Sequence, residues 1–180
     1  MFKGFLGAVS ALAILAGAHA AQAAEPLKIG FMATLEGTYT VLGEDGLRGF
    51  KVALDAIGNK AGGRDIEYII GATDASPDSA IRAVRKLVEQ DKVDIIVGPL
   101  SGSEGIALRD YSKTQPQTTF INGASGAQET TYVTPSENFF RYNMDGAQWS
   151  VGLGEYVYKE KGYETCLLYT SPSPRDMWTS

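Results

Sequence analysis

The residues that could do chemistry in this chain give little support to an enzyme. Residues 123–127 (GASGA) are similar to the G-x-S-x-G elbow that presents a nucleophilic serine, with Ser125 in the position of the nucleophile. Ala127 replaces the last glycine of the elbow, and the single histidine, His19, lies in a segment that we expect to be removed. A serine nucleophile needs a general base, usually a histidine. We therefore expect no enzyme, and a secreted hydrolase that uses Ser125 is the least favoured alternative.

The patterns of metal and nucleotide sites are also missing. The spacing of Gly43, Gly46 and Gly49 is neither the dinucleotide fingerprint nor a P-loop, and it favours close packing of a helix instead. The aspartates between residues 74 and 94 are not spaced as in an EF-hand. Without a histidine in the mature chain, histidine-based metal sites are excluded. We expect no cofactor and no metal.

A small polar turn at residues 101–103 is the first candidate for binding an anion. It follows the apolar run 93–97 and consists of Ser101, Gly102 and Ser103. Ser101 and Glu104 fit the S-x-x-E capping box, so Ser101 is the expected N-cap of a helix. The free amides at a helix N-terminus attract negative charge, although many capped turns have only a structural role.

A second small turn follows the apolar run 118–121. It consists of Gly123, Ala124 and Ser125, and its small residues allow close approach of a backbone to a ligand. In an open α/β sheet, ligands bind beyond the carboxyl ends of the strands. We therefore expect both turns to converge on one cleft and to bind the carboxylate of a small ligand.

Three other side chains near this edge have two interpretations each. Arg141, beside Tyr142 and Asn143, fits an anion clamp or a structural ion pair, and we favour the ion pair. Tyr39 and Tyr132 lie in expected loops at the same edge. Either ring could stack on a ligand, although exposed loop tyrosines need no function.

Hydrophobic periodicity predicts that strands and helices alternate. Apolar runs predict strands at residues 27–35, 66–72, 93–97, 118–121, 139–142 and 167–169, and the run 93–97 is largely β-branched. Apolar stripes predict helices that begin near residues 47, 77 and 101, and a fourth helix over 145–161. The first stripe consists of Leu47, Phe50, Leu54 and Ile57, with loops expected at 36–46 and 61–63. This order predicts an α/β fold with a doubly wound, mostly parallel sheet.

Composition and charge restrict the location and the partners. Lys3, the apolar run 5–17 and the A-x-A sites before residue 24 predict a secretory signal peptide over residues 1–23, and thus a periplasmic protein. The chain has 16 Lys and Arg against 21 Asp and Glu, and without Lys3 the mature part is more acidic still. Nucleic acid is therefore a poor partner. The single cysteine, Cys166, excludes an intrachain disulfide.

The segments LKIGFMATLEGTYTVLGEDGLRGFKVAL, DIIVGPLSGSEG and INGASGAQE, together with the signal peptide, resemble the type I periplasmic binding proteins of the leucine/isoleucine/valine type. The resemblance covers about residues 27–164. It implies two α/β lobes that close over an amino acid, an aromatic acid or an amide, and delivery of that solute to the permease of an ABC importer. The resemblance implies that the two turns bind the ligand's carboxylate. In the first turn, Gly102 stands where many amino-acid receptors of this family carry a serine. A ligand-sensing receptor domain of the same fold is the other alternative.

The resemblance also predicts the domain boundaries. It implies that residues 24–142 form the first lobe and that 143–165 begin a second lobe, of which most is missing. The tail 166–180 contains TSPSPRDMWTS, which follows neither a helical nor a strand period and looks like translated adapter sequence. We expect this tail to be non-native.

Overall fold

The computed structural model describes residues 24–164, and their architecture is a six-stranded mixed sheet with helices on both faces. The strand order is β2-β3-β1-β4-β5-β6. The strands are β1 (Leu27–Thr34), β2 (Lys60–Ala61), β3 (Arg64–Thr73), β4 (Ile95–Val97), β5 (Thr119–Asn122) and β6 (Phe139–Arg141). All neighbouring strands pair in parallel except β2 with β3. The predicted doubly wound, mostly parallel α/β fold is confirmed.

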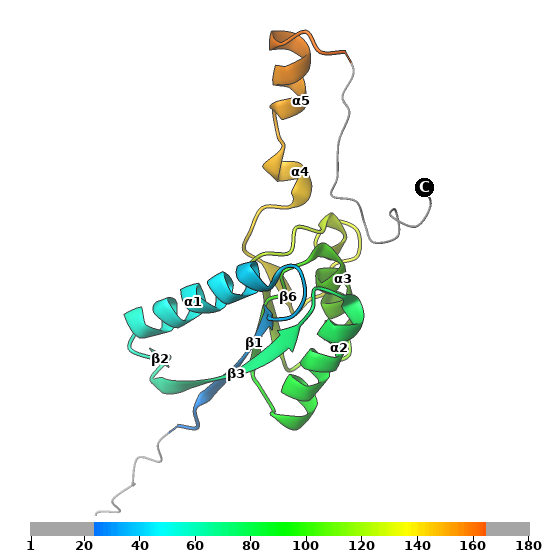
Figure 1. Cartoon of the computed structure of the whole chain (residues 1–180). Coiled ribbons are helices and arrows are strands. Elements are labelled where there is room, and N and C mark those ends of the chain that lie inside the picture. Colours follow the sequence, from blue (N-terminus) through cyan, green and yellow to red (C-terminus); the bar gives the residue numbers. More distant parts are fainter. Residues whose placement is uncertain (1–23, 165–180) are drawn as a thin grey trace, which may run out of the picture.

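Helices cover the two faces of the sheet unequally (Figure 1). On one face lies α1 (Thr40–Ala56), where Phe50 stacks on Phe31 of β1 at a centroid distance of 4.4 Å. On the other face lie α2 (Pro77–Arg85), the π-helical turn η1 (Lys86–Gln90) and α3 (Gly102–Ser112). The main core lies under these elements and includes the fully buried Ile96 and Phe120. Burial of this apolar area supplies most of the driving force for the fold.

The first helix is longer than its apolar stripe predicts. It begins at Thr40, so most of the expected loop 36–46 is helical, and Ile57, which we expected on the buried stripe, follows the helix and is 54% exposed. The first turn of the helix lies directly against β1: a Cβ on Gly43 would lie 1.8 Å from the carbonyl oxygen of Thr34. Gly43 therefore packs closely as predicted, whereas a Cβ on Gly46 or Gly49 would meet no other atom.

Of the expected loop 61–63, Ala61 belongs to β2, and Gly62 and Gly63 form the turn of a small hairpin. Gly62 and Gly63 have φ angles of +57° and +77°, and β2 pairs antiparallel with the start of β3. Glycine adopts these angles without a steric cost, so the turn is tight and β3 begins at Arg64, two residues before the expected strand.

The expected helix over 145–161 is interrupted. It consists of α4 (Gly146–Trp149), α5 (Leu153–Glu155) and the π-helical turn η3 (Tyr156–Glu160), with Gly152 at a φ of +81° between α4 and α5. The two short helices and this turn extend away from the sheet (Figure 1). The apolar stripe of the expected helix 145–161, with Trp149, Leu153 and Tyr156, is exposed. The periodicity of a stripe predicts a helix only when that stripe packs against a core, which this segment lacks among the described residues.

Three of the predictions lie outside the described residues. These are the signal peptide 1–23, the strand 167–169 and the tail 166–180 with Cys166. Between residues 24 and 164, none of the helices has both the length and the apolar character needed to span a membrane.

Candidate ligand-binding edge of the sheet

The first turn, between β4 and α3, forms the predicted capping box. Ser101 is the N-cap: its Oγ accepts the amide of Glu104 at 3.2 Å, and the carboxylate of Glu104 accepts the amide of Ser101 at 2.9 Å. Ser101 Oγ also donates to the carbonyl of Ala75 at 2.9 Å, so the proton of this hydroxyl is already engaged. The box uses two of the four amides that a helix start leaves unpaired, and the amides of Gly102 and Ser103 have no intrahelical acceptor.

The second turn, after β5, is organised by Asn122. Its buried side chain accepts the amides of Ala124 and Ser125 at 3.1 and 2.8 Å and donates to the carbonyl of Ser125 at 2.8 Å. Sequence reasoning missed this role, although an asparagine directly after an apolar strand is a known turn former. Because Asn122 engages two amides of the turn, those amides are not free for a ligand.

The Ser125 side chain points away from the sheet edge. It is 0% exposed, and its Oγ is buried without a hydrogen-bond partner. A Cβ on Gly105 of α3 would lie only 2.1 Å from this Oγ, so the hydroxyl faces the helix. In this geometry the Ser125 hydroxyl, which we expected at the ligand, faces α3, and it is unsuited to a nucleophile, which must be accessible.

A cavity of about 500 Å³ lies at the carboxyl edge of the sheet, and we call it the edge cavity. Three of the expected site residues line it, namely Tyr39, Ser101 and Gly102. Five further residues line it that sequence reasoning did not assign to the site, namely Leu42, Leu100, Gly126, Ala127 and Trp149. The first turn thus lines this cavity with Ser101 and Gly102, whereas the second turn, residues 123–125, does not line it and only the two residues that follow it, Gly126 and Ala127, do.

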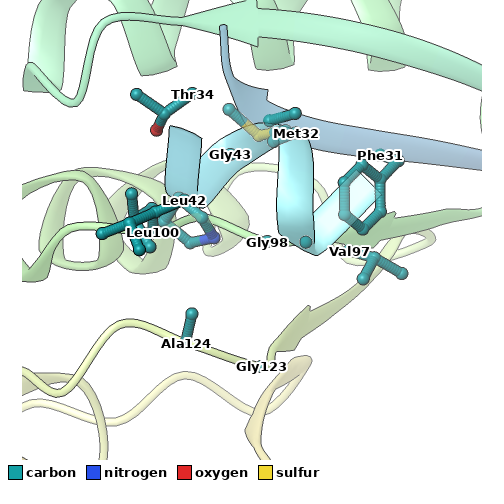
Figure 2. A pocket seen from close by; sticks show the side chains of 13 residues that line it. Phe31, Met32, Thr34, Leu42, Gly43, Val97, Gly98, Leu100, Gly123 and Ala124 are labelled. Atoms are coloured by element: carbon teal, nitrogen blue, oxygen red, sulfur yellow. The ribbon is translucent and has the colours of Figure 1, made fainter. Parts of the chain in front are cut away.

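A smaller cavity of about 200 Å³ lies next to it, between α1 and the strand ends (Figure 2). We call it the inner cavity. Gly123 and Ala124 line it, and it shares Leu42 and Leu100 with the edge cavity. Ser103, in contrast, lines neither cavity and is exposed, with its Oγ 3.3 Å from that of Ser101. The expected site residues are therefore distributed over two adjoining cavities, a surface position and a buried one.

The segment between β6 and α4 is anchored to the second turn. Asn143 donates to the carbonyl of Ala124 at 2.9 Å, and the amide of Gly146 donates to the carbonyl of Gly126 at 2.9 Å. Asp145 caps α4 by accepting the amides of Ala147 and Gln148. These contacts place α4 beside the edge cavity.

Arg141 makes an ion pair with Asp145, as favoured from the sequence. Its guanidinium also donates to Thr131 Oγ1 at 2.7 Å and lies 5.6 Å from the ring centre of Tyr132. The amide of Gln148, and then the amide of Ala147 and Arg141, hold the pKa of Asp145 below its ordinary value despite burial. Arg141 is thus part of the structural link to α4 and lines neither cavity.

A family model described as periplasmic binding protein matches residues 26–177. The chain belongs to the periplasmic binding protein family. The matched range includes most of the tail that we expected to be non-native. Since members of this family bind solutes and are not catalytic, the family agrees with the prediction that the chain is not an enzyme.

Relatives support this family assignment and indicate how much of a full-length member the chain covers. The chain is 29% identical over 154 residues to the Leu/Ile/Val-binding protein homolog 7 of Brucella suis biovar 1, which covers 85% of this chain and 38% of that relative. An ABC transporter substrate-binding protein from Sphaerobacter thermophilus is 35% identical, with a TM-score of 0.68 over 77% of this chain and 38% of that chain. A solute-binding protein from R. palustris, solved in complex with benzoate, is 26% identical with a TM-score of 0.70 over 76% of this chain and 38% of that chain. The chain therefore spans 38% of the length of these relatives and corresponds to one lobe.

Proposed function

We propose that this chain is the first lobe of an extracytoplasmic solute-binding protein of an ABC importer, and that it binds an amino acid or a related small carboxylate. The observation that carries the proposal is the start of α3 at the edge cavity. The capping box leaves two amides free there, and one of them belongs to Gly102, which lines the cavity. An eleven-residue helix directs its positive end to this point, where an anion is stabilised.

The relatives agree with a carboxylate as the ligand. Benzoate, found in the R. palustris protein, is a small aromatic carboxylate, and the Brucella relative is named for leucine, isoleucine and valine. These ligands have different bodies and share the carboxylate. The first lobe can therefore recognise the shared group while other residues select the body.

The mechanism that follows is closure of two lobes over the solute. A ligand favours the closed arrangement only by as much as it binds that arrangement better than the open one. In this chain the edge cavity supplies one wall of such a site. Half of the ligand would stay solvated until a second wall covers it.

Two variants at Gly102 test the anion site. Proline is well tolerated at the first position of a helix, and Ser101, with φ −83° and ψ 155°, has the extended backbone that precedes proline. Gly102→Pro removes one free amide, whereas Gly102→Ala keeps it and adds a Cβ at an ordinary contact distance of 3.6 Å from the Cβ of Ala127.

Calorimetry on the protein expressed from the complete gene should separate the two variants. A hydrogen bond to a charged group contributes ~1.5 to 3 kcal/mol, so Gly102→Pro should weaken benzoate or leucine binding by roughly tenfold or more. Gly102→Ala should stay near the unmodified protein. Equal affinities in both variants would place the carboxylate elsewhere.

Export is the second part of the proposal. Periplasmic binding proteins act outside the cytoplasm, and the expected cleavage before residue 24 fits that location. N-terminal sequencing of periplasmic material should begin at or near Ala24 or Glu25, and an intact Met1 would contradict export by cleavage.

A further inference from the structure

Trp149 is a large aromatic residue at the edge cavity, and it belongs to neither of the two turns. It lies on α4, outside the sheet, and is 58% exposed. Its side chain lines the edge cavity together with Tyr39, which precedes α1. Two aromatic rings from distant parts of the chain thus face one cavity.

The position of Trp149 is fixed by contacts of its own helix. The amide of Gly146 donates to the carbonyl of Gly126 at 2.9 Å, and the capping box of Asp145 and Gln148 holds the first turn of α4. A Cβ on Gly126 would lie 2.8 Å from Cη2 of Trp149 and 3.2 Å from the amide nitrogen of Gly146. The absence of a side chain at residue 126 therefore lets the indole lie against the backbone of Gly126.

The remaining lining of the edge cavity suits an apolar ligand body. Leu42 and Leu100 add aliphatic surface to the two rings, and the side chains that line this cavity among residues 24–164 carry no charge. The free amides at the start of α3 are the part of the wall that suits an anion. Aromatic faces pair well with another flat ring, beyond the effect of the buried area alone.

We propose that Tyr39 and Trp149 make the edge cavity selective for a planar aromatic monocarboxylate, with Trp149 as a specificity-determining residue. This inference rests on the proposed function, since it places the ligand's carboxylate at the start of α3. The ring of the ligand then lies against the indole, and the ligand's body rather than its head group decides the selection.

The test compares benzoate with cyclohexanecarboxylate, which has the same head group and a similar size without a π face. Calorimetry uses the protein expressed from the complete gene. Benzoate should bind roughly tenfold tighter, the upper end of what an aromatic pair adds. Trp149→Leu, which keeps apolar volume without a ring system, should bring the two affinities close together, while Trp149→Phe should keep most of the preference.

Two further variants complete the test, the first as a control and the second as a perturbation of the indole. Tyr158→Leu removes an exposed aromatic side chain from the same segment that lines neither cavity, and it should leave both affinities unchanged. Gly126→Ala keeps the indole but crowds it, and it should weaken benzoate binding. Circular dichroism of each variant confirms that it is folded.

The outcomes separate this inference from the proposed function. If leucine binds and benzoate does not, or if Trp149→Leu leaves the preference for benzoate unchanged, the inference is wrong and the carboxylate site still stands. If benzoate, cyclohexanecarboxylate and leucine all fail to bind, both proposals are wrong.

Discussion

The Nη2 of Arg141 lies 3.3 Å from Oδ2 of Asp145, and the two side chains are only 5% and 1% exposed. Arg141 ends β6 and Asp145 caps α4, so this pair joins the sheet to the helix that carries Trp149. The attraction within a buried pair of this kind contributes little net stability. Removing one partner costs much more stability, because the remaining charge is left uncompensated.

We predict that Arg141→Met lowers the melting temperature more than the double variant Arg141→Met/Asp145→Asn. The single change leaves the buried carboxylate without its cation, whereas the double change removes both charges. Thermal unfolding followed by circular dichroism measures the difference. A double variant that is less stable than the single variant would contradict this account.

Asp74 makes stability depend on pH at the acid end. Its carboxylate accepts the amide of Ser76 at 2.9 Å and the hydroxyl of Ser79 at 2.6 Å, and hydrogen bonds from these two serines lower the pKa of Asp74 from 3.8 to about 2. A lowered pKa means that the folded state favours the charged form, so the stabilisation is complete above the unfolded pKa and is lost as the pH falls from about 4 towards 2.

The measurement is urea unfolding at pH 6, 4 and 3 for the unmodified protein and for Asp74→Asn. The variant should be less stable at pH 6, and the difference between the two proteins should shrink as the pH falls. A constant difference over this range would show that the charge of Asp74 is not involved.

Two glycines of α1 should respond in opposite ways to the same change. Gly43→Ala places a Cβ 1.8 Å from the carbonyl oxygen of Thr34, which is backbone and cannot move aside, and it should destabilise by ~1 to 3 kcal/mol or more. Gly49→Ala adds a Cβ in open space within a helix and should stabilise by about 0.5 to 1 kcal/mol. Denaturant unfolding of both variants checks the prediction, and equal effects would contradict the packing of α1 on β1.

Ser125 and Ser101 should differ when each is replaced by alanine. Ser125→Ala removes a buried hydroxyl without a partner, so stability and ligand affinity should stay within error or improve slightly. Ser101→Ala removes the N-cap of α3 and should cost about 1 kcal/mol of stability. Melting curves with calorimetry on both variants test this, and a loss of affinity in Ser125→Ala with intact folding would restore its hydroxyl to the site.

The sequence by itself determined most of the local elements of the fold. The alternation of apolar runs and stripes predicted the parallel sheet, because strand and helix periods differ. The capping box at Ser101 was predicted correctly, since its two hydrogen bonds join residues only three apart. The ion pair of Arg141 was favoured as a structural role, but its partner Asp145 was not named.

Only the tertiary structure decided which side chains face the edge cavity. Ser125 is turned towards Gly105, and Asn122 engages the amides of the second turn, because these contacts depend on how α3 and β5 pack. Trp149 reaches the cavity because backbone hydrogen bonds fix α4 beside Gly126, a position about twenty residues away in the sequence. Periodicity shows which residues share a face of one element, and it contains no information about the face that a different element presents to them.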